Sequence, residues 1–481
     1  MDRRDFLKSL AMLASGSALM PYGVLAAPGD WRLAFEGVTQ DLPDTPMQVE
    51  GVIPEECYGT LYRNGPALYQ RGEQRYQHWF DPDGMVQAYR LGADGVSHAG
   101  RFVRTQKFLQ ESAAGRFLFD GAGSKFADSL PARNNESGNV ANINVQPFNG
   151  ELLALWEAGS PYRMDPDSLD TLGQQYWLPE LKGVPFSAHP HVDGTGDMWN
   201  IGAAPWASRP TLALYHIGKK GQLKKYRMQQ LPEMGYIHDF VLTPRYLVVL
   251  NSSSIMGVGE TFVGSMHWTP TRPSELLFFD RNDFSLVKTL DVPATFVFHF
   301  GNGWEQAGRI CFTACEYRND SIATRAMYHL VRGAPTAQLP ESRLVRYAVD
   351  LAAGTVQKTD LELPFEFPSY DRRRPFQAQQ LYGVAGGDSG SAGLSGEIAC
   401  IDPRTGKRDS FRYGDHVIVE EPQLVFGRSG AFVVHSYLDT HNGQTGLAIL
   451  RAGNLSDGPV ARATMDRIVP PGFHGCFLPK A

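Results

Sequence analysis

Short apolar segments alternate along the chain with turns rich in Gly, Asp and Asn, and the alternation recurs as one strand, a turn and a second strand. Apolar runs of this length between turn residues are typical of β-strands in hairpins. Seven hairpins are recognisable, spaced by roughly 50 to 75 residues, which is a period typical of repeat architectures. They begin near Met85, Pro161, Leu212, Glu275, Leu344, Glu397 and Gly446.

Further short apolar strands, such as 246–250 and 431–434, lie between the hairpins. Two strands in each hairpin and two between hairpins make four-stranded units, and seven units predict an all-β chain folded as a seven-bladed β-propeller. A large β-sandwich or a two-domain all-β chain is the alternative, because the chain carries no short blade signature. No linker interrupts the units, so residues 28–481 are interpreted as one catalytic domain, with 105–140 as an excursion outside the blades.

Residues 1–27 have the pattern of an export signal. The pair Arg3-Arg4 and the following Phe6-Leu7-Lys8 precede an apolar stretch that ends in small residues at Ala26-Ala27. A basic start, a short apolar region and a small-residue cleavage site are typical of a secretory signal, and the adjacent arginines resemble the twin-arginine type. The sequence therefore predicts export of the folded protein to the periplasm. An uncleaved anchor or a buried helix is the alternative interpretation.

Composition and cysteine spacing refine this picture. The 50 glycines and 32 prolines suit many short strands, and the net charge of −6 argues against a nucleic-acid partner. Five cysteines are an odd number without framework spacing. Cys311 and Cys315 lie in an apparent strand, where four residues span ~13 Å, beyond the ~7 Å limit for a disulfide. We expect the cysteines to be core thiols.

Four of the thirteen histidines occupy the same place relative to the hairpins. Counted from the nearest preceding hairpin start, they follow at intervals of about 24 to 28 residues, which is one strand position in the repeat. They are His189, His238, His299 and His474. The same count after the fifth and sixth hairpins arrives near Glu366 and Glu421. In a propeller this is the innermost strand, so the sequence predicts a ring of imidazoles and carboxylates around one axis.

Four imidazoles without a carboxylate ligand suit Zn, Cu, Fe or Ni. A structural zinc closes its tetrahedron, whereas an octahedral ion with four protein ligands keeps two positions open for O2 or a substrate. The nearby carboxylates then accept the second ring N–H of the histidines and fix the tautomer. This chemistry predicts a metal centre and leaves the choice of metal open.

At these positions the chain resembles the carotenoid cleavage oxygenase family. The shared motifs run in the family's order from about residue 50 to the C-terminus, and the ordered set is far more specific than any single motif. They are Arg63-Asn-Gly-Pro66, His78-Trp-Phe-Asp81, Asp83-Gly-Met85, Leu155-Trp-Glu157, Ala188-His-Pro190, His238-Asp-Phe240, Phe298-His299 with Asn302 and Glu305, Glu421-Pro422 and Phe473-His-Gly475.

The resemblance implies a seven-bladed propeller with a dome of loops and helices over a non-haem Fe(II) held by the four histidines. It also implies that Glu157 supports His238, Glu366 supports His299 and Glu421 supports His474, with no carboxylate on His189. Because Glu420 precedes Glu421, a shift of one residue in this assignment is possible.

Four positions depart from the family pattern. Pro82 and Gln87 replace residues that are commonly Gly and His. Ile143 stands where many members have Thr, close to the open iron position, and an apolar group there would alter how O2 or a carbonyl approaches. Trp156 replaces a Lys that stilbene-cleaving members tend to carry, which disfavours lignostilbene-type substrates.

The leading hypothesis is that the enzyme is a dioxygenase, with O2 and an apolar conjugated small molecule as reactants. It would split a C=C bond of a carotenoid or apocarotenoid into two carbonyl products. The alternatives are a stilbene- or phenylpropene-cleaving dioxygenase, an iron-dependent isomerase or isomerohydrolase, and a non-catalytic binding propeller. Phe117, Phe119 and Trp199 are expected to line a substrate tunnel or to belong to the core. The 115–130 excursion is the candidate for peripheral membrane contact.

Overall fold

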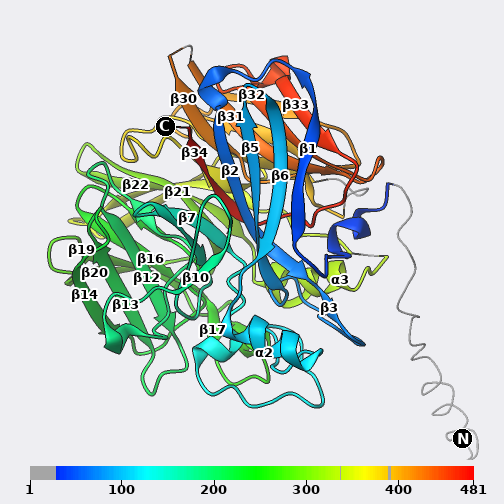
Figure 1. Ribbon diagram of the computed structural model, residues 1–481. Coiled ribbons are helices and arrows are strands. Elements are labelled where there is room, and N and C mark those ends of the chain that lie inside the picture. Colours follow the sequence, from blue (N-terminus) through cyan, green and yellow to red (C-terminus); the bar gives the residue numbers. More distant parts are fainter. Residues whose placement is uncertain (1–28, 336, 388–391, 429, 481) are drawn as a thin grey trace, which may run out of the picture.

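The computed structural model describes residues 29–335, 337–387, 392–428 and 430–480, and the export signal expected at 1–27 lies outside this part of the chain. The described chain is almost entirely β-structure, and every paired strand in it is antiparallel to its neighbours (Figure 1). It folds as a propeller-like arrangement of sheets that follow one another along the chain.

Five sheets have four strands each. They are β7 (Asn144–Phe148), β8 (Glu151–Leu155), β9 (Tyr162–Met164) and β10 (Thr171–Gln174); β11 (His191–Val192), β12 (Met198–Ala204), β13 (Thr211–Ile217) and β14 (Leu223–Gln230); β15 (Phe240–Leu242), β16 (Tyr246–Asn251), β19 (Ser274–Asp280) and β20 (Leu286–Val292); β21 (Phe296–Gln306), β22 (Arg309–Tyr317), β23 (Arg343–Asp350) and β24 (Thr355–Asp360); and β25 (Phe365–Ser369), β26 (Leu381–Gly387), β27 (Ser395–Ile401) and β28 (Arg408–Arg412).

A ten-stranded sheet joins the two ends of the described chain, and Figure 1 shows its blue N-terminal strands beside its orange and red C-terminal ones. Its strands are β1 (Leu42–Gly51), β2 (Gly59–Leu68), β5 (Asp83–Gly92), β6 (Gly95–Phe102), β29 (Val417–Val419), β30 (Gln423–Gly427), β31 (Gly430–Asp439), β32 (Gln444–Arg451), β33 (Pro459–Met465) and β34 (His474–Pro479). Strand β1 connects the N-terminal and C-terminal strands of this sheet, because its residues 42–47 pair with β6 and its residues 48–51 pair with β33. On the other side β34 pairs with β2.

All seven predicted hairpins are present, as β5–β6, β9–β10, β13–β14, β19–β20, β23–β24, β27–β28 and β32–β33. Local turn chemistry explains why they could be predicted. Between β9 and β10 the Asp165 carboxylate accepts the backbone N–H groups of Asp167 and Ser168, at 3.0 and 2.8 Å. Between β27 and β28 the chain turns at Gly406, whose φ of +76° is one that glycine adopts without strain. The count of seven blades stays a prediction, because the sheets at the two chain ends are continuous.

The predicted excursion outside the sheets holds α2 (Gln106–Ala114) and the short helix η3 (Asn135–Gly138). Helix α3 (Met327–Val331) continues directly from the π-helical η6 (Ile322–Ala326). Two small sheets have two strands each, β3 (Gln70–Arg71) with β4 (Gln74–Arg75) and β17 (Ser254–Met256) with β18 (Met266–Trp268). The remaining short helices are η1 (Trp31–Phe35), η2 (Glu55–Cys57), η4 (Pro179–Leu181), η5 (Val263–Ser265) and η7 (Leu455–Asp457). No helix among the described residues has the length and apolar character needed to span a membrane.

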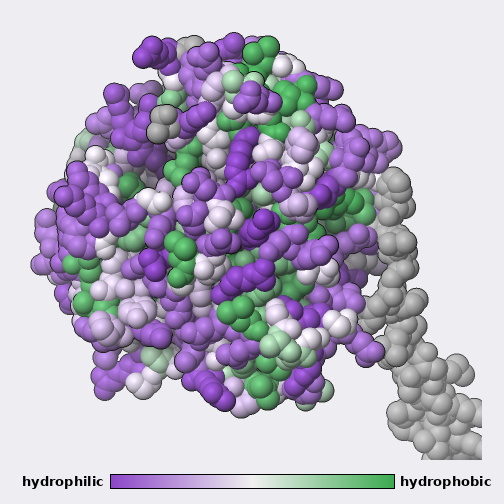
Figure 2. All heavy atoms as spheres, in the orientation of Figure 1, coloured by the Kyte–Doolittle hydropathy of each residue, from purple (hydrophilic) through white to green (hydrophobic). Residues whose placement is uncertain are grey.

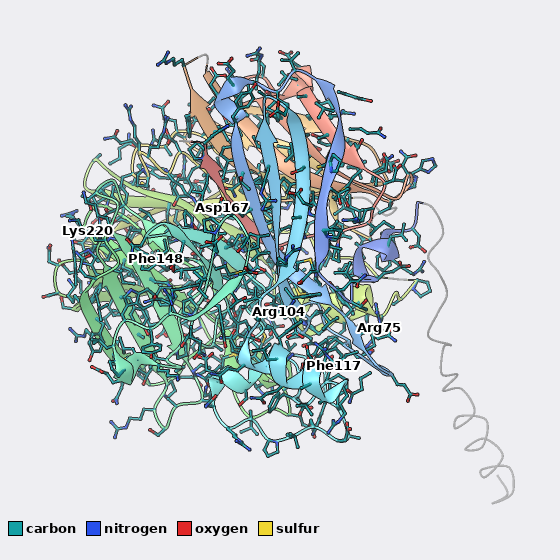
Figure 3. The ribbon with its side chains drawn as sticks, in the orientation of Figure 1. Arg75, Arg104, Phe117, Phe148, Asp167 and Lys220 are labelled. Atoms are coloured by element: carbon teal, nitrogen blue, oxygen red, sulfur yellow. The ribbon has the colours of Figure 1, made fainter. Side chains whose placement is uncertain are left out.

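The 115–130 segment combines buried aromatic residues with exposed positions. Phe117, which follows α2 (Figure 3), is fully buried, and Phe119 is buried as well. The ring of Phe117 stacks on that of Phe126. Leu130 is 48% exposed and Leu109 of α2 is 53% exposed. Figure 2 shows hydrophobic groups over this helix on a face that is otherwise largely hydrophilic.

The structure confirms that the five cysteines are buried free thiols.

Candidate metal centre

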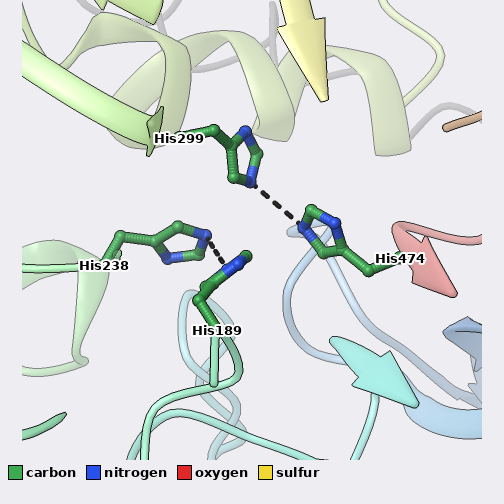
Figure 4. A group of neighbouring side chains, drawn as sticks. All are labelled: His189, His238, His299 and His474. Carbon is green, nitrogen blue, oxygen red and sulfur yellow. Dashed lines mark hydrogen bonds between the residues drawn. The ribbon is translucent and has the colours of Figure 1, made fainter. Parts of the chain in front are cut away.

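The four histidines of the repeat meet at one point, where their side chains converge from separate sheets (Figure 4). His189 lies just before β11 and His238 just before β15, while His299 lies in β21 and His474 begins β34. One nitrogen from each ring lies within 4.8 Å of the others, and the four residues are only 4–9% exposed. The equivalent position of each histidine after its hairpin therefore brings the four imidazoles to a common centre.

The spacing of the ring nitrogens fits a metal ion. The Nε2 atoms of His189 and His238 are 2.9 Å apart, and those of His299 and His474 are 3.1 Å apart. Adjacent nitrogens bound at right angles to an ion with bonds of about 2.1 Å lie about 3.0 Å apart. Two Nε2 lone pairs this close repel one another unless a cation or a proton lies between them. The donor set and its spacing thus suit a divalent ion that binds imidazole.

Three of the histidines contact a carboxylate through the nitrogen that faces away from the centre. Glu366 Oε2 lies 2.5 Å from Nδ1 of His299, and Glu421 Oε1 lies 3.0 Å from Nδ1 of His474. Glu157 contacts Nδ1 of His238 in the same way. A carboxylate at Nδ1 holds the proton there, so that the Nε2 lone pair points to the centre. Among the described residues His189 has no carboxylate partner.

Burial sets the protonation of the centre. Burial lowers the pKa of His189 well below its usual value, and the imidazoles of His238 and His474 lower it further. Burial also lowers the pKa of His474 to about 4, although Glu421 acts in the opposite direction. For His299 burial acts downward, but Glu366 outweighs it and raises the pKa. His189 and His474 are therefore neutral near pH 7, which is the form that binds metal.

Arg63 of β2 lies fully buried beside the Glu421 carboxylate, a role that its sequence motif did not reveal. Its Nη1 donates to Glu421 Oε2 at 3.2 Å, and its Nη2 donates to Glu420 Oε2 at 3.1 Å. Burial would raise the pKa of Glu421, but His474 and Arg63 lower it to about 2. Arg63 thus binds both adjacent acids, and of the two only Glu421 also contacts His474. A charged residue within a mostly apolar strand was the available signal, because a buried cation requires a partner.

Tyr236 is a second residue that sequence reasoning missed. Its buried hydroxyl lies 3.2 Å from both oxygens of Glu157 and 2.8 Å from Nδ1 of His238. The ring stacks on Phe296 with the ring centroids 5.5 Å apart. The hydroxyl can donate to the carboxylate and so fix its orientation toward the histidine.

An apolar cavity ends on the centre. It encloses about 1170 Å³, including its opening to solvent, and its wall includes His238, His299 and His474. Most of its wall is hydrophobic and includes Trp79, Phe80, Ile143, Phe298, Phe367 and Phe473, while Glu366 and Glu421 line it at the histidines. Such a cavity accepts an elongated hydrophobic molecule and excludes water around it.

Phe367 occupies its place at the cost of backbone strain. Its φ is +54°, a conformation that non-glycine residues rarely adopt. The strained turn places its ring 5.0 Å from the ring of His299 and 5.1 Å from that of His474. Its backbone N–H donates to Glu366 Oε2 at 3.1 Å. Strain of this kind costs about 1–3 kcal/mol and is concentrated at functional sites.

A second, polar pocket reaches the centre from other residues. Its wall includes His189, His299 and His474 together with His191, Asp239, Tyr370, Arg372 and Gln146. Its empty space is about 530 Å³, including the part open to solvent. The histidine cluster therefore separates an apolar cavity from a polar one.

The positions that depart from the family pattern lie at different distances from the centre. Ile143 lines the apolar cavity, and its carbonyl accepts the backbone N–H of His474 at 3.2 Å. Gln87 instead donates to the carbonyl of Pro470. Trp156 packs on the core, and Trp199 stacks on His216, so neither is part of the cavity wall. Phe117 and Phe119 also pack away from it.

Comparison with known proteins gives full-length matches. Residues 35–479 match the family model described as retinal pigment epithelial membrane protein. The apocarotenoid-15,15'-oxygenase of Synechocystis sp. is 29% identical, over 94% of this chain and 96% of its own length. An isoeugenol monooxygenase of Pseudomonas nitroreducens is 27% identical, over 90% and 94%. A resveratrol cleavage oxygenase of Aspergillus fumigatus is 33% identical over 54% of this chain and 53% of its own.

Solved structures agree with this relationship. The cobalt-substituted Synechocystis apocarotenoid oxygenase superimposes with a TM-score of 0.84 at 27% identity, covering 95% of this chain and 99% of that one. The family match spans nearly all of the described residues, and it includes all four histidines. The chain therefore belongs to the retinal pigment epithelial membrane protein family, the carotenoid cleavage oxygenases that its motifs resemble.

Proposed function

We propose that this protein is an oxygenase that uses O2 to cleave a conjugated C=C bond of an apolar small molecule, with a carotenoid or apocarotenoid as the leading substrate class. The observation that carries the proposal is the apolar cavity that ends on three of the four clustered histidines. The relative with an apocarotenoid oxygenase name matches over nearly the whole chain, which supports this substrate class.

The proposed cofactor is Fe(II), held by His189, His238, His299 and His474. When bound, the iron supplies the site at which O2 is activated. Glu157, Glu366 and Glu421 are proposed to keep a proton on Nδ1 of their histidines, which holds each ring in the orientation that binds metal. They adjust the charge of the centre rather than transfer protons during the reaction.

The cavity wall is proposed to position the substrate. Phe80 and Phe298, whose ring centroids are 6.1 Å apart, give flat surfaces against which a polyene can lie. Phe298 also packs on His238 at 5.1 Å between ring centroids, so a molecule bound there lies beside the metal ligands. The apolar side chains exclude water, which limits side reactions at the reacting carbons.

Oxygen uptake tests the proposal. The full chain is loaded anaerobically with Fe(II), and O2 consumption and aldehyde formation are measured with an apocarotenoid and with a hydroxystilbene. We expect O2 uptake coupled to aldehyde formation on the apocarotenoid. Absence of bound iron, or bound iron without O2 uptake on either substrate, would refute the proposal. Conversion of the substrate without O2 uptake would instead indicate the isomerase alternative.

A stilbene or phenylpropene substrate is the second candidate. The relatives named for resveratrol cleavage and for isoeugenol favour it. The hydroxyl-bearing Tyr317 lines the same cavity and offers a partner for a phenolic group. In the assay above, activity on the hydroxystilbene alone would select this candidate.

We also propose that the propeller has seven blades under a dome of loops and helices. The ten-stranded sheet then counts as two blades that share β1, since the two halves of this strand pair with different neighbours. Together with the five four-stranded sheets this gives seven. In this proposal residues 28–481 form one domain, and α2 and η6–α3 belong to the dome.

The remaining proposals concern location. The twin-arginine pattern at 1–27 supports export to the periplasm, tested by fractionating cells that express the wild type or the Arg3→Lys, Arg4→Lys variant. Peripheral membrane contact is proposed for the 115–130 excursion together with Leu109, because Leu109 and Leu130 are exposed. Unchanged binding to liposomes after replacement of both leucines by Ser would contradict it.

A further inference from the structure

The polar pocket raises the question of what reaches the histidine cluster through it. The pocket wall contains imidazole, carboxylate, amide and phenol groups, and it includes three of the four clustered histidines. Val192 and Arg372, which also line it, are both exposed, so the pocket opens to solvent at these residues. A small polar species can therefore approach the centre without crossing the apolar cavity.

His191 is held in this pocket in a form that offers a nitrogen lone pair. Its Nε2 lies 3.1 Å from Oδ1 of Asp239, and Asp239 Oδ2 accepts the backbone N–H of Phe300 at 2.9 Å. Since the ionised carboxylate only accepts, the His191 proton lies on Nε2. Its Nδ1 then faces the hydroxyl of Tyr370 at 3.2 Å and is an acceptor. When the Tyr370 hydroxyl rotates away, this nitrogen can replace a water molecule of a hydrated cation.

The apolar cavity is a poor passage for the same ion. Most of its wall is aromatic or aliphatic. The carboxylates that line it near the cluster, Glu366, Glu421 and Glu420, already contact His299, His474 and Arg63, so few groups remain to replace the hydration shell of a divalent cation. Removing the hydration shell of an ion without substitute ligands is very unfavourable in a low-dielectric environment. The two openings therefore differ in the species that they can admit.

We propose that the polar pocket is the route by which the metal ion reaches the four histidines, with His191 as an intermediate ligand. The inference rests on the proposed metal centre, and it adds the direction from which the centre is loaded. It assigns the apolar cavity to the organic substrate and the polar pocket to the cation. Arg372 lies at the opening and opposes a cation there, so its charge should limit the rate of loading.

Stopped-flow uptake of Co2+ by the metal-free full chain tests the route. Val192→Trp places an indole at the opening of the polar pocket, and the matched Leu339→Trp places the same group in the partly exposed wall of the apolar cavity. We expect Val192→Trp to slow uptake on the order of tenfold, because the indole must move aside before the ion can enter and this raises the activation free energy of entry. Leu339→Trp should leave the rate within about twofold of wild type by the same reasoning. The final amount of bound cobalt should be equal in all three proteins.

A charge variant tests the same route independently of any steric effect. Arg372→Gln should accelerate uptake about two- to fourfold at low ionic strength, and the difference should vanish in high salt. Slow uptake in Leu339→Trp with a normal rate in Val192→Trp would overturn the inference, as would equal rates in all variants. Failure of the wild type to bind cobalt at all would instead refute the metal centre of the proposed function.

Discussion

The two openings on the histidine cluster differ in chemistry although they share His299 and His474. One is walled by rings such as Phe80 and Phe298, and the other by groups such as Asp239 and Gln146. Here two imidazoles form the boundary, so hydrophobic binding and ionic access can be altered separately.

His299→Ala removes a residue of the boundary itself. We expect metal affinity to fall by more than about 100-fold, beyond the 10–100-fold loss typical of a changed supporting residue. Oxygen uptake should be lost with the metal. Metal content after dialysis measures the effect, and His267→Ala, at an exposed histidine outside the cluster, is the control. Full metal content in His299→Ala would show that the cluster is not the binding site.

Glu157→Gln alters a support of the boundary and leaves the ligands in place. The amide can no longer hold the Nδ1 proton of His238 as strongly, so metal affinity should fall about 10- to 100-fold. Competition with a chelator measures this affinity. Glu151→Gln, which removes a carboxylate paired with Arg163, should not change it. Equal affinities in the two variants would contradict the assigned role of Glu157.

Phe80→Ala changes only the apolar side. Loss of a ring from the cavity wall should lower kcat/KM for an apolar substrate about tenfold, while the metal content stays at the wild-type level. Phe148→Ala removes a ring of the same size at the end of β7 (Figure 3), which is not among the residues that line the cavity, and should leave kcat/KM unchanged. A parallel loss of metal in Phe80→Ala would show that the two sides are coupled.

Tyr236→Phe should give the smallest change. It removes one hydrogen bond to Glu157, which corresponds to about fivefold weaker metal binding. Because the ring remains stacked on Phe296, thermal stability should change little. The rate of metal release to a chelator is the sensitive measurement, with Tyr246→Phe on β16 as the control. An unchanged release rate would mean that Glu157 is held without the hydroxyl.

The hairpins could be predicted because their signals are local. Alternating apolar residues and turn formers such as Asp165 and Gly406 act within a few residues of the chain. The two pairings of β1 could not be predicted, because nothing in residues 42–51 indicates that one half of the strand pairs with β6 and the other half with β33. Pairings between strands this distant in sequence depend on the closed arrangement as a whole.

The same distinction applies to the centre. The histidines were found because the repeat places them in one register, and Glu366 and Glu421 followed from the same count. Glu157 came only from the family motif. Tyr236 and the polar pocket were missed because their partners lie on other sheets, and a buried tyrosine gives the same apolar pattern whether or not its hydroxyl has a partner.

The pairing of β2 with β34 has a consequence for biosynthesis. Asn64 is directly opposite His474, although the two lie 410 positions apart in the numbering of the chain, and the last ligand stands on the strand that closes the ring. During translation the first three histidines emerge long before the fourth. A nascent chain therefore has no complete cage, and metal capture awaits ring closure. Correct metallation therefore reports that the two ends of the fold have met.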